Sequence, residues 1–340
     1  MNYVLFAGNR IANAVPVLLG VVVVTFVLMR LLPGDPAAFF ATSPNPTQEE
    51  MDQIRDLLGL DKPLHVQLWD YLSSVLAGDL GNSLLTGRSV SEDILSRIPA
   101  SAELTFYAML ISLSLSLPMG VISALYQGSL FDHFVRVIST LGVSVPTFVT
   151  GLVLIYAFYF HLNVAPAPID RIDVFVVPPP TVTGFLTFDA LIDWNMEALY
   201  SSLAQLILPS LTMAIFVLSP LTRMTRASMI GTLSSDFVRT ARSAGLSWWN
   251  LNIRYAFRNA FIPVLTTMGL VFSYMLGANI LVERVFAWPG IGSYALNALT
   301  ASDYAPVQGY VLVMGTIYVT INLTIDLVYG LIDPRLSVGR

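Results

Sequence analysis

The chain has 340 residues, of which 55% are hydrophobic and only 11% are charged, and its formal net charge is −5. A soluble domain carries about a quarter charged residues, so this composition excludes an ordinary soluble globule and predicts an all-α polytopic membrane protein. The sequence contains no cysteine, which excludes disulfides and thiolate metal sites.

Six windows without Asp, Glu, Lys or Arg approach the roughly 20 residues that a helix needs to cross the hydrocarbon core. The first resembles a signal peptide, but its apolar run is too long and no small-residue cleavage site follows it. Around the six windows we expect six transmembrane helices, at residues 11–32, 100–127, 135–161, 200–223, 260–283 and 305–332.

Arginine placement orients the chain, because cytoplasmic segments carry an excess of basic residues. The Arg-rich segments then lie inside, and both termini are cytoplasmic; these segments are residues 1–10, 224–259 and 333–340. The external segments are residues 33–99, 162–199 and 284–304, and the first holds ten acidic and four basic residues. Its acidity fits either plain solubility or a docking role. The pattern predicts a multi-pass protein of the cell inner (plasma) membrane.

The external segment 33–99 holds two expected amphipathic helices. Thr47 and Glu50 form a capping box before the first, and Gly59 is its expected stop. The second should end near Gly78. These helices form either a cap packed on the outer mouth or a surface that receives a delivered ligand. The external segment 162–199 is Pro-rich and long for a plain connection, so it is either functional or loosely ordered.

Catalytic motifs are missing, so we expect a protein without a catalytic site of its own. The single lysine, Lys62, has no P-loop around it, and no nucleophile motif appears. The three histidines have no ligand spacing, so no metal site is expected; they are His65, His133 and His161.

Three acidic residues fall within or at the ends of the expected spans. Glu103 and Glu283 lie close enough to the outer interface that we expect them to stay hydrated. Asp326 is either a carboxylate bonded to a neighbouring helix or part of a proton relay. Prolines in or at the ends of spans are candidate hinges, although membrane helices tolerate proline; these are Pro118, Pro146, Pro209, Pro220 and Pro263.

The stretch from Ser234 to Val264 carries four arginines against one acid and lies between two apolar segments. Its first part is expected to be a short helix that Ser235 or Asp236 caps and Gly245 ends. One face should carry Phe237, Thr240, Ala241 and Ala244. Such a helix fits either the groove of a partner protein or anionic lipid.

The sequence "RTARSAGL…AFRNAFIPV" resembles the EAA loop of ABC-importer permeases, in the form of the dipeptide/oligopeptide/nickel subfamily. Arg239 replaces the usual Glu of the wider motif. Five more motifs resemble the first permease subunit of that subfamily, dipeptide permease B-like, in the same order: "LLPGDP", "LGLDKPLHVQLWDYL…GDLGNS", "FDHFVRVISTLGVSVPTF", "ERVFAWPGIGSYALNAL…DYAPVQG" and "DPR".

The resemblance implies a type I ABC-importer permease fold and a coupling helix that docks on an ATPase. The implied partners are a second homologous permease, two ATP-binding-cassette ATPase subunits that bind ATP and Mg, and an external (periplasmic) solute-binding protein. No cofactor is expected in this chain. The implied coupling residues are Asp236, Phe237, Arg239, Thr240, Ala241, Arg242, Ala244 and Gly245.

The implied substrates are di- and oligopeptides, and the residues that bind them remain unassigned. A nickel-complex, glutathione-like or opine-like importer permease of the same family is an alternative, since the subfamily handles several cargo classes. An ion-coupled secondary transporter is a rival from another class, but it would need an inverted repeat and essential ionisable residues near the midplane.

Overall fold

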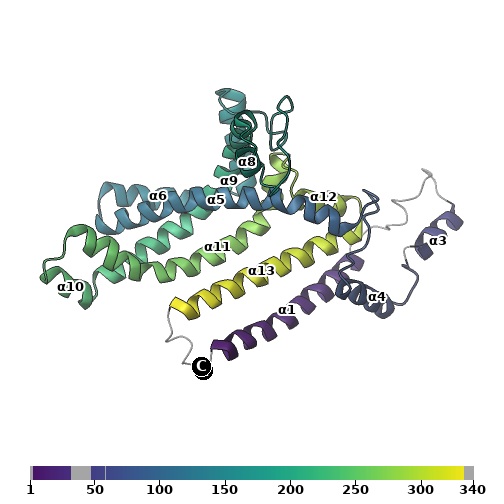
Figure 1. The fold of residues 1–340 in the computed structure, drawn as a ribbon, viewed down its shortest axis with the longest axis horizontal. Helices are drawn as coiled ribbons and strands as arrows, with labels where there is room; N and C mark the ends of the chain where they lie inside the picture. The colour runs from purple at the N-terminus through teal and green to yellow at the C-terminus, as the bar shows by residue number, and fades with distance from the viewer. Residues whose placement is uncertain (1–2, 32–46, 58, 333–340) are drawn as a thin grey trace. The chain divides into compact units, whose positions relative to one another are not determined.

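The computed structural model describes residues 3–31, 47–57 and 59–332, and helices dominate those ranges (Figure 1). The all-α fold class is confirmed for this part of the chain. Its helices are α1 (Tyr3–Leu31), α3 (Gln48–Leu57), α4 (Leu64–Leu76), α5 (Val90–Leu125), α6 (Leu130–Ser144), α7 (Thr147–Leu154), the π-helix η1 (Ile155–His161), α8 (Leu186–Ile192), α9 (Met196–Leu233), α10 (Asp236–Ser243), the π-helix η2 (Asn250–Phe257), α11 (Arg258–Val285), α12 (Ile291–Thr300) and α13 (Tyr304–Ile332).

The chain divides into two compact units. One comprises the residues up to Ile98 together with those from Gly290 onward, and the other is Pro99–Pro289. In the first unit α1 and α13 lie side by side (Figure 1). A Cβ at Gly309 of α13 would lie 2.6 Å from Cγ1 of Val90, so this glycine permits a close approach to the start of α5.

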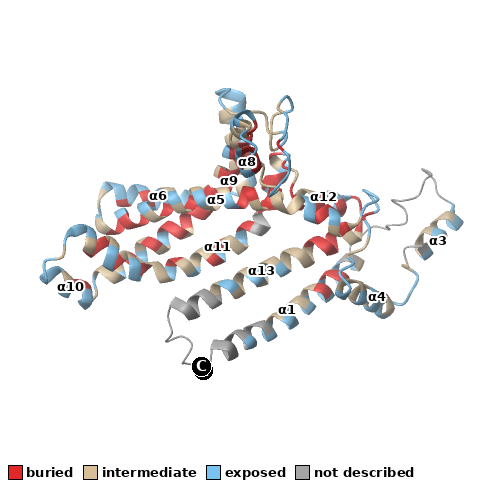
Figure 2. Cartoon of the chain, in the orientation of Figure 1, coloured by how far each residue is buried: buried red, intermediate tan, exposed pale blue. Residues whose placement is uncertain are grey.

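The second unit is built around α9, which packs against α6, α7, α8 and α11. Its apolar core includes Leu104 of α5, Leu221 of α9 and Met275 of α11. Figure 2 shows buried residues along α9 and mainly exposed ones on α10. A long helix that neighbours surround is expected to be apolar on most of its faces, and α9 fits that description.

Four described helical segments are long and apolar enough to cross a membrane: Val90–Leu125, Met196–Leu233, Asn250–Met275 and Tyr304–Ile325. The pair Leu130–Ser144 and Thr147–His161 counts as a fifth if the two halves form one span, and Ala12–Leu28 is a shorter apolar helix. The expected span 100–127 lies largely within α5, which begins ten residues earlier, at Val90.

The two expected external helices are present as α3 and α4. The amide of Glu50 donates to Oγ1 of Thr47 at 3.3 Å, as the capping box predicts. Gly59 and Gly78 both take positive φ angles, +67° and +82°, after these helices. Local sequence signals were therefore sufficient to place both helices.

Candidate functional site: the α9–α11 connection and the break at Pro146

The helix α10 occupies the connection between α9 and α11. Asp236 lies in its first turn and Arg242 in its last, which suits the helix dipole. Ser235 is the N-cap residue, but its hydroxyl donates to the Thr232 carbonyl at 2.5 Å and does not cap the helix. The helix forms where the sequence predicted it, with a different first-turn contact.

Gly245 ends α10 in the left-handed conformation, with φ +78°. The amide of Gly245 donates to the Arg242 carbonyl at 3.0 Å, and the amide of Leu246 donates to the Ala241 carbonyl at 3.3 Å. This pair of bonds is the Schellman motif. Because an L side chain strains this backbone, the glycine sets the direction in which the chain leaves α10.

Val238 attaches α10 to the rest of the unit. It is fully buried and packs in a cluster with Met229 of α9 and Leu251 of η2. Ala241 is half-buried and packs against this cluster, so it lies at the edge between the buried side of α10 and the exposed side that holds Phe237, Thr240 and Ala244. Val238 was not among the predicted contact residues, although its spacing of three from Ala241 makes the two side chains neighbours on the helix.

The opposite side of α10 is exposed. Phe237 has 45% of its surface accessible, a large apolar side chain for a free surface. Arg239 and Asp236 form an exposed ion pair at 3.5 Å, of a kind that contributes little to stability. The expected site residues that lie on this exposed surface are Asp236, Phe237, Arg239, Thr240, Arg242, Ala244 and Gly245.

An ion pair between a buried carboxylate and a half-buried guanidinium joins α6 to α9 in the same unit. Arg226 donates from Nε to Oδ1 of Asp132 at 2.6 Å and from Nη2 to Oδ2 at 2.9 Å. The Ser123 hydroxyl and the Gly128 amide donate to the same carboxylate. No sequence pattern predicted this pair, because its two residues are 94 positions apart in the chain.

The prediction that Glu103 and Glu283 stay hydrated is wrong, because both side chains are fully buried. Glu103 accepts from Arg171 Nη2 at 2.5 Å and from the Thr187 amide and hydroxyl at 2.9 and 2.6 Å. Glu283 accepts from the Ser101 hydroxyl at 2.5 Å. Hydrogen bonds from the protein, several of them from the 162–199 segment, replace water around these carboxylates.

Asp189 shows the same ordering within the 162–199 segment. Burial raises the pKa of its carboxyl, but hydrogen bonds from the Thr183 amide and hydroxyl, both 2.7 Å, and from the Gly184 amide outweigh burial and leave the pKa below its ordinary value. Asp189 therefore ties parts of the Pro-rich segment to one another, and Glu103 of α5 holds the segment against the helices. The loosely ordered alternative is wrong for it.

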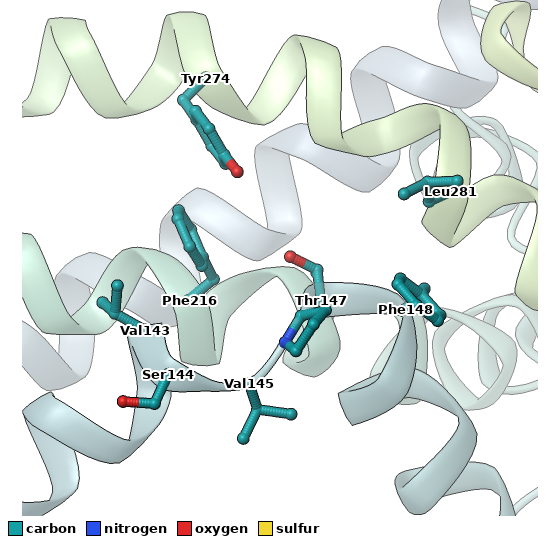
Figure 3. Close-up of a pocket in the computed structure, with 9 residues that line it drawn as sticks. Val143, Ser144, Val145, Thr147, Phe148, Phe216, Tyr274 and Leu281 are labelled. Atoms are coloured by element: carbon teal, nitrogen blue, oxygen red, sulfur yellow. The ribbon is translucent and has the colours of Figure 1, made fainter.

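The chain breaks sharply at Pro146, where it bends by 105° between Leu130–Ser144 (α6) and Thr147–His161 (α7 and η1). The other four candidate hinge prolines lie inside the continuous helices α5, α9 and α11. A cavity of ≈ 290 Å³ opens at the break (Figure 3). Its lining residues are Val143, Ser144, Val145, Pro146, Thr147, Phe148, Phe216, Tyr274 and Leu281.

Several expected features lie outside what the structure describes. Residues 32–36 of the "LLPGDP" motif, the "DPR" motif and the cytoplasmic tail 333–340 belong to this group, as does the side chain of Asp326. Among the described residues, no cluster of three His, Asp or Glu side chains is placed to hold a metal ion. His133 contacts the carbonyl of Ser129, the N-cap residue of α6, through Nδ1 at 2.8 Å.

Comparison with known proteins covers nearly the whole chain. Residues 116–338 match the family described as binding-protein-dependent transport system inner membrane component, and residues 3–105 match the N-terminal membrane component of the same systems. A probable D,D-dipeptide transport system permease, DdpB of Escherichia coli K12, is 42% identical over 97% of both chains.

Two further relatives have similar coverage. The di/tripeptide transport system permease DppB of Pseudomonas aeruginosa UCBPP-PA14 is 38% identical over 98% of this chain and 99% of its own. The dipeptide transport system permease DppB of Escherichia coli K12 is 36% identical over 97% of this chain and 98% of its own. The chain therefore belongs to the family of inner membrane components of binding-protein-dependent transport systems, the permease subunits of ABC importers.

Proposed function

We propose that this chain is one of two homologous permeases in an ATP-driven importer of di- and oligopeptides. An external solute-binding protein delivers the peptide, and two ATP-binding-cassette subunits hydrolyse ATP on the cytoplasmic side. The peptide substrate is supported by relatives with nearly full-length similarity, which are named for D,D-dipeptides, di/tripeptides and dipeptides. The chain itself supplies the path and the coupling contact.

The observation that carries this proposal is the construction of α10. Its outer side exposes Phe237 beside polar and small residues, while Val238 holds its inner side in the cluster with α9 and η2. A partner that moves α10 therefore also moves α9, because a close-packed interior transmits displacement. In this proposal α10 is the coupling helix, and its exposed residues meet the ATPase.

The proposed topology follows from this assignment. α10 lies in the cytoplasm, and six transmembrane segments place both termini there: α1, α5, the bent α6–α7 pair, α9, α11 and α13. ATP binding draws the ATPase subunits together, and the spans move between inward-open and outward-open states as rigid bodies.

Gly245→Asp tests the coupling role. The φ of +78° strains any L side chain, so the variant misdirects the chain after α10 without touching the buried core. We expect a normal amount of protein in the membrane and loss of ATP-driven peptide uptake. Gly231→Asp is the matched control, because Gly231 is an exposed helical glycine with open space around it, and it should retain uptake.

Uptake in Gly245→Asp at the level of the original protein would refute the coupling role of α10. Because the chain has no cysteine, Ala244→Cys provides a unique site for crosslinking to the ATPase. Uptake that persists when the proton gradient is dissipated and ATP is retained would separate this proposal from an ion-coupled transporter. Mass spectrometry of the ligand bound to the cognate solute-binding protein would identify the substrate.

A further inference from the structure

We infer that the cavity at the α6–α7 break binds one apolar side chain of a peptide in transit through the membrane. This inference rests on the proposed function and assigns part of the substrate path that the proposal leaves open. The cavity lies entirely within the unit Pro99–Pro289.

The break that creates the cavity is built into the sequence. Pro146 has no amide hydrogen, and a proline disfavours helical geometry in the residue before it. Val145 is accordingly extended, with φ −101° and ψ 129°, and α7 restarts at Thr147 without a side-chain cap. Main-chain groups at such a helix end have no intrahelical partners, so the break presents polar backbone beside the cavity.

The walls of the cavity are apolar and partly aromatic. Phe216 of α9 and Tyr274 of α11 stack with ring centroids 4.7 Å apart and an interplanar angle of 15°. Figure 3 shows Tyr274 directed toward Phe216, with Phe148 and Leu281 at the other end of the space. Tyr274 and Leu281 are about half exposed, so the cavity is open to an incoming group.

Size and chemistry together favour a peptide side chain. A volume of ≈ 290 Å³ lies near the lower limit of roughly 300 Å³ for small-molecule sites, which suits one side chain or a small dipeptide. None of the nine lining residues is charged, so the cavity offers nothing to a charged metal complex. A peptide brings both an apolar side chain for the walls and main-chain groups for the polar backbone at the break.

The position of the cavity also fits a transported ligand. The two halves of the bent pair α6–α7 are long and apolar enough to cross a membrane only when they are taken together. Transporter sites are often formed at broken membrane helices, because these expose main-chain groups to substrate within an otherwise apolar layer. The cavity at Pro146 has both features.

Changing the size of the cavity provides the test. Leu281→Trp narrows it and Phe216→Ala widens it, and ATP-driven uptake of Ala-Ala and Phe-Phe is measured for each variant in competition. Pocket volume changes of this kind shift discrimination by about tenfold or more. We expect Leu281→Trp to lower the Phe-Phe to Ala-Ala uptake ratio about tenfold and Phe216→Ala to raise it. Leu270→Trp is the matched control on α11, since Leu270 is exposed and does not line the cavity.

The outcomes separate the inference from the proposed function. If the original chain takes up neither peptide with ATP, the proposed function fails and the inference fails with it. If the original chain takes up peptide but both cavity variants keep its uptake ratio, only the inference is refuted. Loss of the second permease on purification of Leu281→Trp, with an unchanged ratio for Phe216→Ala, would assign the cavity to a subunit interface and overturn the inference.

Discussion

Asp132→Asn removes the charge that holds α6 against α9. The carboxylate is 1% exposed and accepts hydrogen bonds from Arg226, Ser123 and the Gly128 amide. Two of these bonds come from the Arg226 guanidinium, at 2.6 and 2.9 Å. In the variant the half-buried guanidinium keeps its position but faces a neutral amide.

The expected loss follows from the burial of the two partners. Breaking a buried ion pair typically destabilises a protein by about 3–5 kcal/mol, because one charge is left uncompensated. The Arg226 side chain is 21% exposed, so water recovers part of its lost solvation. We therefore expect a loss at the lower end of that range, about 3 kcal/mol.

Unfolding of the purified protein in detergent micelles by heat or denaturant measures this loss. Arg223→Met is the control on the same helix, because Arg223 is exposed, and it should change stability by less than about 0.5 kcal/mol. The double variant Asp132→Leu with Arg226→Met should recover most of the loss, since neither charge remains buried alone.

Two results would refute this reasoning. Asp132→Asn could unfold within about 0.5 kcal/mol of Arg223→Met, which would mean that the pair contributes nothing. Alternatively, the double variant could lose as much as Asp132→Leu and Arg226→Met, measured singly and added together, and the two residues would then be energetically independent.

Two further predictions concern packing and pH. Gly120→Ala should lower the free energy of unfolding by about 1–3 kcal/mol, because the new Cβ would lie 2.5 Å from Cβ of Thr225. Gly231→Ala has open space and should raise the free energy of unfolding by roughly 0.5–1 kcal/mol. Equal shifts of the unfolding midpoint in the two variants would contradict the close approach of α5 and α9. Burial raises the pKa of the Asp303 carboxyl in the folded protein above 3.8, so the protonated carboxyl favours folding. The stability that it contributes is fully present below pH 3.8 and is lost as pH rises through the folded-state pKa. Asp303→Asn should therefore flatten the fall in stability over that window, and an unchanged pH profile would contradict this prediction.

Local signals in the sequence placed much of the helical framework. Thr47 and Glu50 marked the start of α3, and Gly245 marked the end of α10, because capping and positive φ depend on a few neighbouring residues. The sequence also identified Pro146 as a candidate hinge, and the chain breaks there. It could not distinguish this proline from Pro209, which continues inside α9.

For the candidate sites too, the sequence predicted local features but not contacts between distant residues. The amphipathic composition of residues 234–245 predicted a short helix in the loop, but its inner face required knowledge of where α9 and η2 lie. Val238 was therefore not predicted as a contact residue, and the half-buried position of Ala241 was not foreseen. The cavity at Pro146 combines residues from α6, α7, α9 and α11, which no short sequence pattern connects.

Composition and periodicity by themselves determined that this chain is helical and spans a membrane, because hydrophobic length and backbone hydrogen bonding leave few alternatives in lipid. The tertiary structure alone decided the partners of the buried charges, such as Glu103 with Arg171 and Asp132 with Arg226. Whether a charged residue is hydrated or paired can be assigned only once the distant helix that covers it is known, because burial depends on the whole fold and not on neighbouring residues.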